Sequence, residues 1–98
     1  MLGSNPLPSN SSSPVPVFDC HVLLTKPVDA GGLWTARCAT AAGVTADAAT
    51  EREVLHKIVS RFKFFVHEHH VRGEPIPWTT PPLAAQPGEL ERFIPVHL

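Results

Sequence analysis

Residues 50–73 of this 98-residue chain, TEREVLHKIVSRFKFFVHEHHVRG, decide its fold. Apolar side chains recur there every three or four residues, which is the period of an amphipathic helix. The recurring positions are Val54, Leu55, Ile58, Val59, Phe62, Phe65 and Val66, with His69 continuing the line. We therefore expect a helix from Glu51 to about Val71 that buries one face against the rest of the domain.

Both ends of this helix are marked in the sequence. Thr50 stands three residues before Glu53, the spacing of a capping box. In that motif the threonine hydroxyl accepts from the Glu53 amide, and the glutamate reaches back to the Thr50 amide. At the other end, Gly73 suits the left-handed position that follows a helix. Residues 74–78 contain two prolines and are expected to be extended.

Three strands are predicted before the helix. Side chains alternate between two faces in Val15–Thr25 and Leu33–Ala39, and residues 26–32 between them are rich in turn formers. A turn centred near Asp29 aligns one apolar face across both strands, and burial of one face fixes strand register. The expected facing pairs are Leu24 with Trp34, Val22 with Ala36, and Cys20 with Cys38. Val44–Ala48 predicts a brief third strand.

The C-terminal part predicts a loop and a last strand. Residues 79–91 carry three prolines and little periodicity, so they are expected to form a loop, whereas residues 92–98 predict a last strand. Pro95 lacks a backbone donor, so this strand belongs at a sheet edge or beside a bulge. If it lies beside the first strand, we expect it to run parallel. The fold class is α+β, in the order β-β-β-α-β, with a small, mainly antiparallel sheet and one helix across one face.

Composition bounds the remaining parts of the chain. Residues 1–14 are mostly Ser, Asn and Pro; such a segment cannot bury enough apolar surface to fold, so we expect a disordered tail before a single domain at residues 15–98. The net charge of -1 argues against strong non-specific nucleic-acid binding. No apolar run reaches the length of a membrane span, and the first residues lack the pattern of a secretory signal. We expect a cytoplasmic protein.

The order of several short motifs resembles the HicB antitoxin family. They are Gly31-Gly32-Leu33-Trp34 in a strand, Thr50-Glu51-Arg52-Glu53 at a helix start, and Gly73-Glu74-Pro75-Ile76-Pro77 at its exit. The resemblance covers roughly residues 17–78. It implies a partly degraded ribonuclease H fold and binding of a small toxin. The chain departs from the family after Trp78, where a proline-rich loop and one strand replace the DNA-binding part.

The carboxylates do not predict a catalytic centre of the ribonuclease H type. Such a centre needs several carboxylates that hold divalent metal ions. Asp19 lies on the sheet face opposite the one expected to pack against the helix, and Glu53 is needed as a cap. The last strand has no carboxylate in residues 93–98. We therefore expect no catalytic residue and no cofactor.

Histidines and cysteines are likewise read as structural or solvated. His56 and His67 lie on the polar helix face, and His70 follows His67 by three residues, but a firm zinc site needs three or four ligands. His69 is expected to be a hydrogen-bonded residue at the core boundary. Cys20 and Cys38 read as two small buried residues, which a reducing compartment keeps unpaired.

Surplus apolar residues point to an interaction surface. On a small domain, several exposed apolar side chains together more often mark an interface than chance exposure. The candidate interface residues are Leu23, Leu33, Phe64, Val71, Ile76 and Trp78. We expect a non-enzymatic interaction domain that forms a homodimer. It either occludes a small basic toxin-like ribonuclease, with Glu51 and Glu74 meeting the partner's basic surface, or is an orphan relative without a toxin partner. The alternative is a small RNA-binding module that uses Lys57, Arg61, Lys63, Arg52 and Arg72 with a stacking tryptophan.

Overall fold

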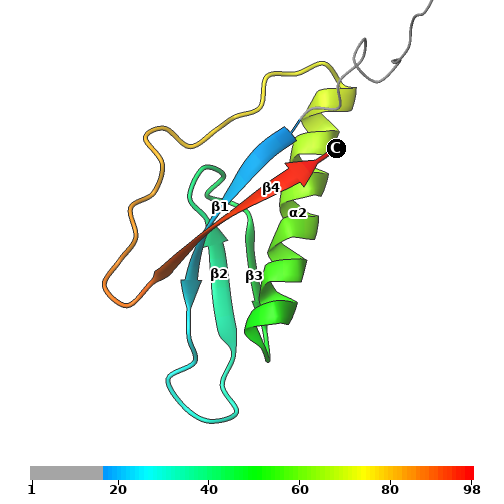
Figure 1. Cartoon of the computed structure of the whole chain (residues 1–98). Coiled ribbons are helices and arrows are strands. Elements are labelled where there is room, and N and C mark those ends of the chain that lie inside the picture. The colour runs from blue at the N-terminus through cyan, green and yellow to red at the C-terminus, as the bar shows by residue number, and fades with distance from the viewer. Residues whose placement is uncertain (1–16) are drawn as a thin grey trace, which may run out of the picture.

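The computed structural model describes residues 17–98 and confirms the α+β class (Figure 1). A four-stranded antiparallel sheet has the order β3-β2-β1-β4, and one helix packs across it. The elements are β1 (Val17–Thr25), β2 (Trp34–Cys38), β3 (Thr45–Ala48), α2 (Glu51–Val71) and β4 (Leu90–His97). The tail expected at residues 1–14 lies outside the described residues. Within residues 17–98, no helix combines the length and the apolar character needed to cross a bilayer.

Helix α2 has the predicted bounds, and local contacts fix both of its ends. The Thr50 hydroxyl accepts from the Glu53 amide at 3.1 Å and donates to the Glu53 carboxylate at 3.1 Å. The glutamate side chain therefore contacts the Thr50 hydroxyl instead of the Thr50 amide expected for a capping box. At the other end the Gly73 amide donates to His70 and the Glu74 amide to His69, the two bonds of a Schellman motif. Gly73 has a φ of 66°, which favours glycine there.

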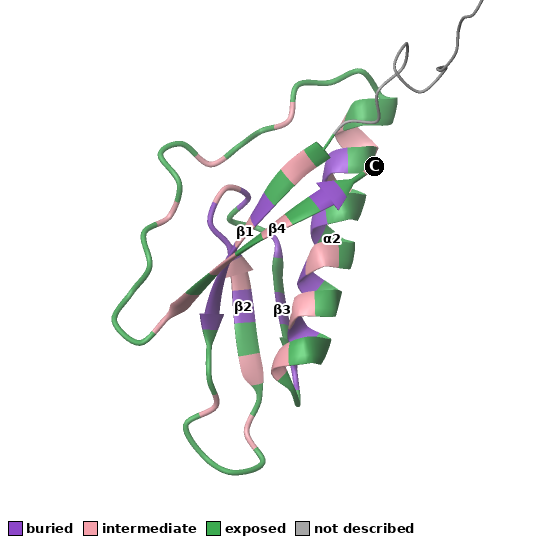
Figure 2. Ribbon diagram, in the orientation of Figure 1, coloured by how far each residue is buried: buried purple, intermediate pink, exposed green. Residues whose placement is uncertain are grey.

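The core lies between α2 and one face of the sheet (Figure 2). The helix contributes a stripe of fully buried side chains at the predicted spacing, namely Val54, Ile58, Phe62 and Val66. Facing them from the four strands are Cys20, Val22, Leu24, Ala36, Cys38, Ala46, Ala48 and Val96. The stripe predicted from the helical period is therefore the face that the helix buries.

The register of β1 against β2 differs from the prediction by two residues. Thr25 pairs with Thr35, so the midpoint of the hairpin is one residue beyond Asp29. The reason is the turn itself, in which the Gly32 amide donates to the Asp29 carbonyl and Gly31 takes a φ of 85°. A shift of two residues keeps every side chain on its predicted face because side chains alternate with a period of two.

The last strand also differs from the prediction. It lies beside β1, but the two strands are antiparallel, from Val17 opposite His97 to Leu24 opposite Leu90. The reason is residues 72–89, which leave the end of α2 and return along the sheet before β4 begins, so the chain reverses direction once more (Figure 1). Pro95 does lie in an edge strand, as its missing donor predicts.

Candidate functional site

The outward face of α2 carries two of the predicted interface residues. Phe64 is 66% exposed and Val71 is 60% exposed. They are seven residues apart, so they lie on the same side of the helix two turns from each other. His67, also exposed, falls between them on that face. Phe64 and Val71 are thus two apolar side chains that point away from the core on either side of a polar one, and we call these two residues the helix stripe.

Ile76 packs against the core, whereas Trp78 packs on other aromatic rings and stays partly exposed. Both follow the helix, and Ile76 is half-buried against the core cluster. The Trp78 ring packs on Phe18 and Phe62 with centroid separations of 5.9 and 6.1 Å. Its exposed fraction of 37% leaves part of the side chain accessible. An aromatic side chain that its neighbours hold in place and leave partly accessible is suited to receive a partner side chain.

A shallow apolar groove of about 290 Å³ adjoins the accessible part of Trp78. It lies where the first residues of β1 meet the segment that follows the helix. Its lining residues are Phe18, Asp19, Thr40, Trp78, Thr79, Thr80 and Pro82. Hydrogen bonds from Thr79 hold this segment to the loop after β2, since its amide donates to Thr40 and its hydroxyl accepts from Ala42. The sequence signals no such groove, because it depends on how the proline-rich segment folds back.

Leu23 and Leu33 do not form the apolar patch expected on the outer sheet face. Leu23 is fully buried, so the expectation that it is exposed is wrong. Leu33 is 52% exposed, but Leu23 pairs with Arg37, four residues beyond Leu33. Four strand residues span about 13 Å. The two leucines are therefore separated, and only Leu33 is available to a partner.

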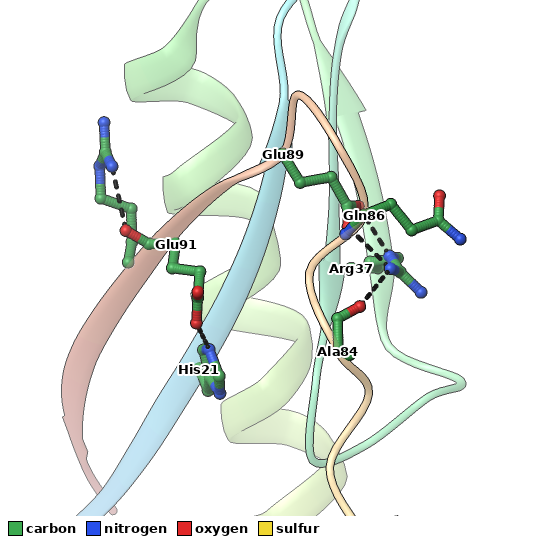
Figure 3. A network of polar contacts seen from close by, with 7 residues as sticks. His21, Arg37, Ala84, Gln86, Glu89 and Glu91 are labelled. Carbon is green, nitrogen blue, oxygen red and sulfur yellow. Dashed lines mark hydrogen bonds and ion pairs between the residues drawn. The ribbon is translucent and has the colours of Figure 1, made fainter.

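An ion pair on the outer face joins Arg37 of β2 to Glu89, just before β4 (Figure 3). The Arg37 guanidinium donates to both Glu89 carboxylate oxygens at 2.8 Å and to the Ala84 carbonyl at 3.2 Å. The backbone amide of Gln86 donates to the same carboxylate at 2.7 Å. These bonds, chiefly those from Arg37, lower the pKa of Glu89, and the carboxylate in turn raises the pKa of Arg37. Residues 79–89 of the expected loop are thus tied to β2, whereas Leu90 and Glu91, also expected in that loop, already belong to β4.

The acidic residues expected to meet a basic partner are paired within the chain. Glu51 accepts from Arg92 at 3.2 Å, and Glu74 accepts from Arg72 at 3.0 Å. Arg72 also contacts Glu68 at 3.1 Å, and it is exposed. These contacts reduce the negative charge that either glutamate presents to another protein.

Several cations of the RNA-binding alternative are engaged in the same way. Lys57 donates to the Asp47 carbonyl at 2.9 Å, and Arg61 donates to the Thr45 carbonyl at 2.7 Å. Since the Lys57 ammonium and the Arg61 guanidinium donate to backbone carbonyls of the sheet, they are less available to phosphates than their positions on a helix suggest. The structure thus offers no observation that favours this alternative.

The two cysteine thiols lie in the core and are free. In the observed register Cys38 faces Val22, and Cys20 is one diagonal position away. A hydrogen bond with the Cys38 sulfur, together with burial, raises the pKa of Cys20, and the same bond lowers the pKa of Cys38 to about 6. The Cys38 sulfur also lies 3.6 Å from the Thr40 hydroxyl. Both thiols are fully buried, so neither is placed to attack a bound substrate.

The histidines and carboxylates are spread over the molecule. His56, His67 and His70 are exposed on α2, and the His69 ring nitrogen lies 2.9 Å from the Phe65 carbonyl, as expected for a boundary residue. Among residues 17–98, no group of three or more His, Cys, Asp or Glu side chains converges as metal ligands would.

In comparisons with protein-family models, curated proteins and solved structures, no match to the chain was found. The resemblance to HicB antitoxins therefore rests on its motifs alone and stays a prediction.

Proposed function

We propose that the chain is a non-enzymatic protein-interaction domain of the HicB type. It associates with itself and binds a small basic protein, such as a toxin-like ribonuclease, whose active surface it covers. The mechanism is steric: apolar anchors dock on the partner and keep its substrate away. The α+β architecture with a single long helix agrees with the build that the motif resemblance implies. The net charge of -1 lets a basic protein approach without net repulsion.

The helix stripe is the observation that carries this proposal. Phe64 and Val71 are large apolar side chains that stay mostly exposed while α2 buries its other face completely. Helices that dock in a partner's groove use anchors at such positions, separated by one or two turns. Truncation of a central aromatic anchor commonly costs about 2 kcal/mol or more of binding free energy. Leu33 and the accessible part of Trp78 are secondary candidates for contact.

The test uses the full chain, tagged and expressed at native level in its own cells. Mass spectrometry should recover a small basic protein in near-stoichiometric amount. The recovered protein, produced separately, should degrade RNA, and one equivalent of the chain should suppress that degradation. The double variant Phe64→Ser/Val71→Ser should lose suppression by about tenfold or more in concentration.

A matched control changes two exposed polar residues of the same helix, His56→Ser and Lys63→Ser. This variant should suppress the ribonuclease as the unchanged chain does. Equal loss in both double variants would argue against the helix stripe as the docking surface. Recovery of the chain alone, as a monomer, would contradict the proposed function. A salt-dependent gel shift with short RNA would instead favour the RNA-binding module.

A further inference from the structure

The two edges of the sheet are protected to different extents. Strand β3 forms one edge of the sheet. The Cys38 amide donates to the Val44 carbonyl, so the backbone groups of Val44 face β2. Because backbone groups alternate in direction along a strand, those of Thr45 and Asp47 point away from β2. The carbonyls of these two residues are the ones that accept from Arg61 and Lys57. Covering an edge with charged side chains is a common way to prevent further strand pairing.

The other edge, β4, has fewer such contacts, since one cation, Arg92, donates to one β4 carbonyl, that of Glu91, at 3.0 Å. The His21 carbonyl accepts from the Ala39 amide on the β2 side, so the backbone groups of His21 face β2 rather than β4. In an antiparallel pair such a residue and its partner, here Phe93, form a non-hydrogen-bonded pair. The backbone groups of Phe93, and of Glu91, Pro95 and His97 by alternation, therefore point outward from the sheet. Pro95 occupies a position where its missing donor costs no bond to β1.

Side chains at these four positions make the outer face of β4 partly apolar. Phe93 is 64% exposed and stacks on the His21 ring with a centroid separation of 4.2 Å. Pro95 is exposed on the same face, between Phe93 and His97. The Glu91 carboxylate accepts from the His21 ring at 2.7 Å and is half-exposed at 47%. An edge with an exposed aromatic ring and outward backbone groups is a template for another strand.

We propose that β4 pairs antiparallel with β4 of a second copy, about a two-fold axis at Ile94. This register places Glu91 opposite His97 of the other copy, so a carboxylate faces an imidazole at both ends. It places Phe93 opposite Pro95, so an exposed ring packs on an exposed proline, and the Phe93 amide still finds the Pro95 carbonyl. The strand is thus complementary to itself, which a two-fold interface requires.

A neighbouring register, with the axis at Phe93, makes fewer favourable contacts. It places Pro95 opposite Glu91 and removes the contact between Glu91 and His97. An axis at Ile94 pairs residues 91–97 in full, within the bounds of β4. The pairing joins two four-stranded sheets into one continuous sheet, and the capped β3 edges remain at its two ends. The inference specifies the self-association part of the proposed function and does not involve the basic partner.

The first test measures sedimentation of the purified full chain from about 10 µM to about 1 mM, a range in which mass action reveals weak dimers. The unchanged chain should pass from monomer to dimer. Phe93→Pro removes an outward amide and leaves the bonds to β1, whereas Phe93→Ala loses the same ring and keeps the amide. Dimerisation of Phe93→Pro should be at least about tenfold weaker than that of Phe93→Ala, since two intermolecular hydrogen bonds are lost.

The second test reads the register by mild oxidation of single-cysteine substitutions. With the axis at Ile94, Ile94→Cys faces itself in a non-hydrogen-bonded pair, about 4.5 Å between Cα atoms, and should cross-link rapidly. Phe93→Cys should cross-link slowly, because each copy then faces Pro95. Both variants are made in the Cys20→Ala/Cys38→Ala chain, because Cys20 is the direct β1 partner of Ile94 and would otherwise compete for the new cysteine within one copy.

Three outcomes would overturn the inference: a monomer over the whole range, equal dimerisation of Phe93→Pro and Phe93→Ala, or faster cross-linking of Phe93→Cys. Circular dichroism of each variant shows whether it has folded, and a misfolded Phe93→Pro leaves the cross-linking comparison to decide. A monomer over the whole range would also remove the self-association part of the proposed function, whereas suppression of a ribonuclease is measured separately and succeeds or fails independently of these outcomes. Binding of a foreign strand at β4 without a dimer would also count against the inference.

Discussion

Arg37 shows how one residue can determine the accessibility of another. Its guanidinium holds Glu89 and Ala84, and with them the returning segment, at the outer face of the sheet. Leu23, which pairs with Arg37 across the hairpin, is fully buried although it lies on the face opposite the core. Local alternation predicts the face correctly but not the burial, because Glu89, which lines the same hollow as Leu23, lies more than fifty positions later.

The Arg37–Glu89 pair should give stability a recognisable pH dependence. The pKa of Glu89 is lowered from its ordinary value of 4.5, so the folded state favours the ionised carboxylate. The corresponding stability is present above pH 4.5 and is lost as pH falls through the lowered folded-state value. Glu89→Gln should therefore be less stable than the unchanged chain at pH 7, and the difference should shrink steadily in more acidic solution.

Urea unfolding of both proteins between pH 7 and pH 3 measures this difference. Glu74→Gln, at a more exposed ion pair, serves as the comparison and should change the midpoint less. A difference between Glu89→Gln and the unchanged chain that stays constant with pH would show that the carboxylate contributes only through packing.

Truncation of the two leucines predicted as interface residues should lower the unfolding free energy by very different amounts. Leu23→Ala empties a fully buried site and should cost about 2–5 kcal/mol of unfolding free energy. Leu33→Ala changes a residue that is 52% exposed and should stay within about 0.5 kcal/mol. Urea unfolding distinguishes them, and similar costs for both would contradict the burial described for Leu23.

At the scale of elements, the helix was predictable and the connections were not. The bounds of α2 follow from Thr50 and Gly73, whose effects extend over a few neighbouring residues. The predicted β1–β2 register differs from the observed one by two residues. The register depends on which turn position adopts the left-handed conformation, and in the sequence both Gly31 and Gly32 can occupy that position. The direction of β4 depends on residues 72–89, whose path no periodic pattern specifies.

The same separation holds for the candidate site. The outward position of Phe64 and Val71 follows from the helical period, so the sequence was sufficient to find the helix stripe. The roles of Ile76 and Trp78 required knowledge of what packs beside them. Both residues come after the helix, where an extended segment can equally leave the domain or lie down on it.

The end of α2 offers a test of a single backbone conformation. Gly73→Ala should lower the unfolding free energy by about 1–2 kcal/mol, because an alanine at a φ of 66° carries the steric cost of the left-handed region. Gly43→Ala is the matched control, since Gly43 has open space around it and no such φ. Thermal or urea unfolding should leave Gly43→Ala nearly unchanged; equal losses would contradict the Schellman end.

At the scale of the whole molecule, the helix protects one edge of the sheet while it covers the core. Lys57 and Arg61 extend from α2 to the backbone of β3. The β4 edge has a proline and one cation contact, from Arg92 to the Glu91 carbonyl at 3.0 Å, and among the hydrogen bonds described for residues 17–98 no cation reaches the Phe93, Pro95 or His97 carbonyl. One edge covered by two helix cations and one edge with fewer contacts favour a closed pair of copies over a growing chain of sheets.

Removing the protection should change the assembly. Lys57→Ser/Arg61→Ser frees the outward carbonyls of β3, and we expect species larger than a dimer as concentration rises. The single variant Lys63→Ser, at an exposed position of the same helix, should behave as the unchanged chain. Sedimentation velocity at matched concentrations measures the difference. A double variant that forms no species larger than a dimer would show that Lys57 and Arg61 are not needed to prevent strand pairing at the β3 edge.

The antiparallel placement of β4 has one more consequence. Val17 and His97 are direct partners, so the first residue of β1 and the last residue of β4 stand on adjacent strands. A short peptide could join these two positions, and new openings could then be cut at an exposed turn such as the one near Gly31. For the same reason the module could be inserted within a host polypeptide, entering and leaving through nearly the same point, without stretching either flank.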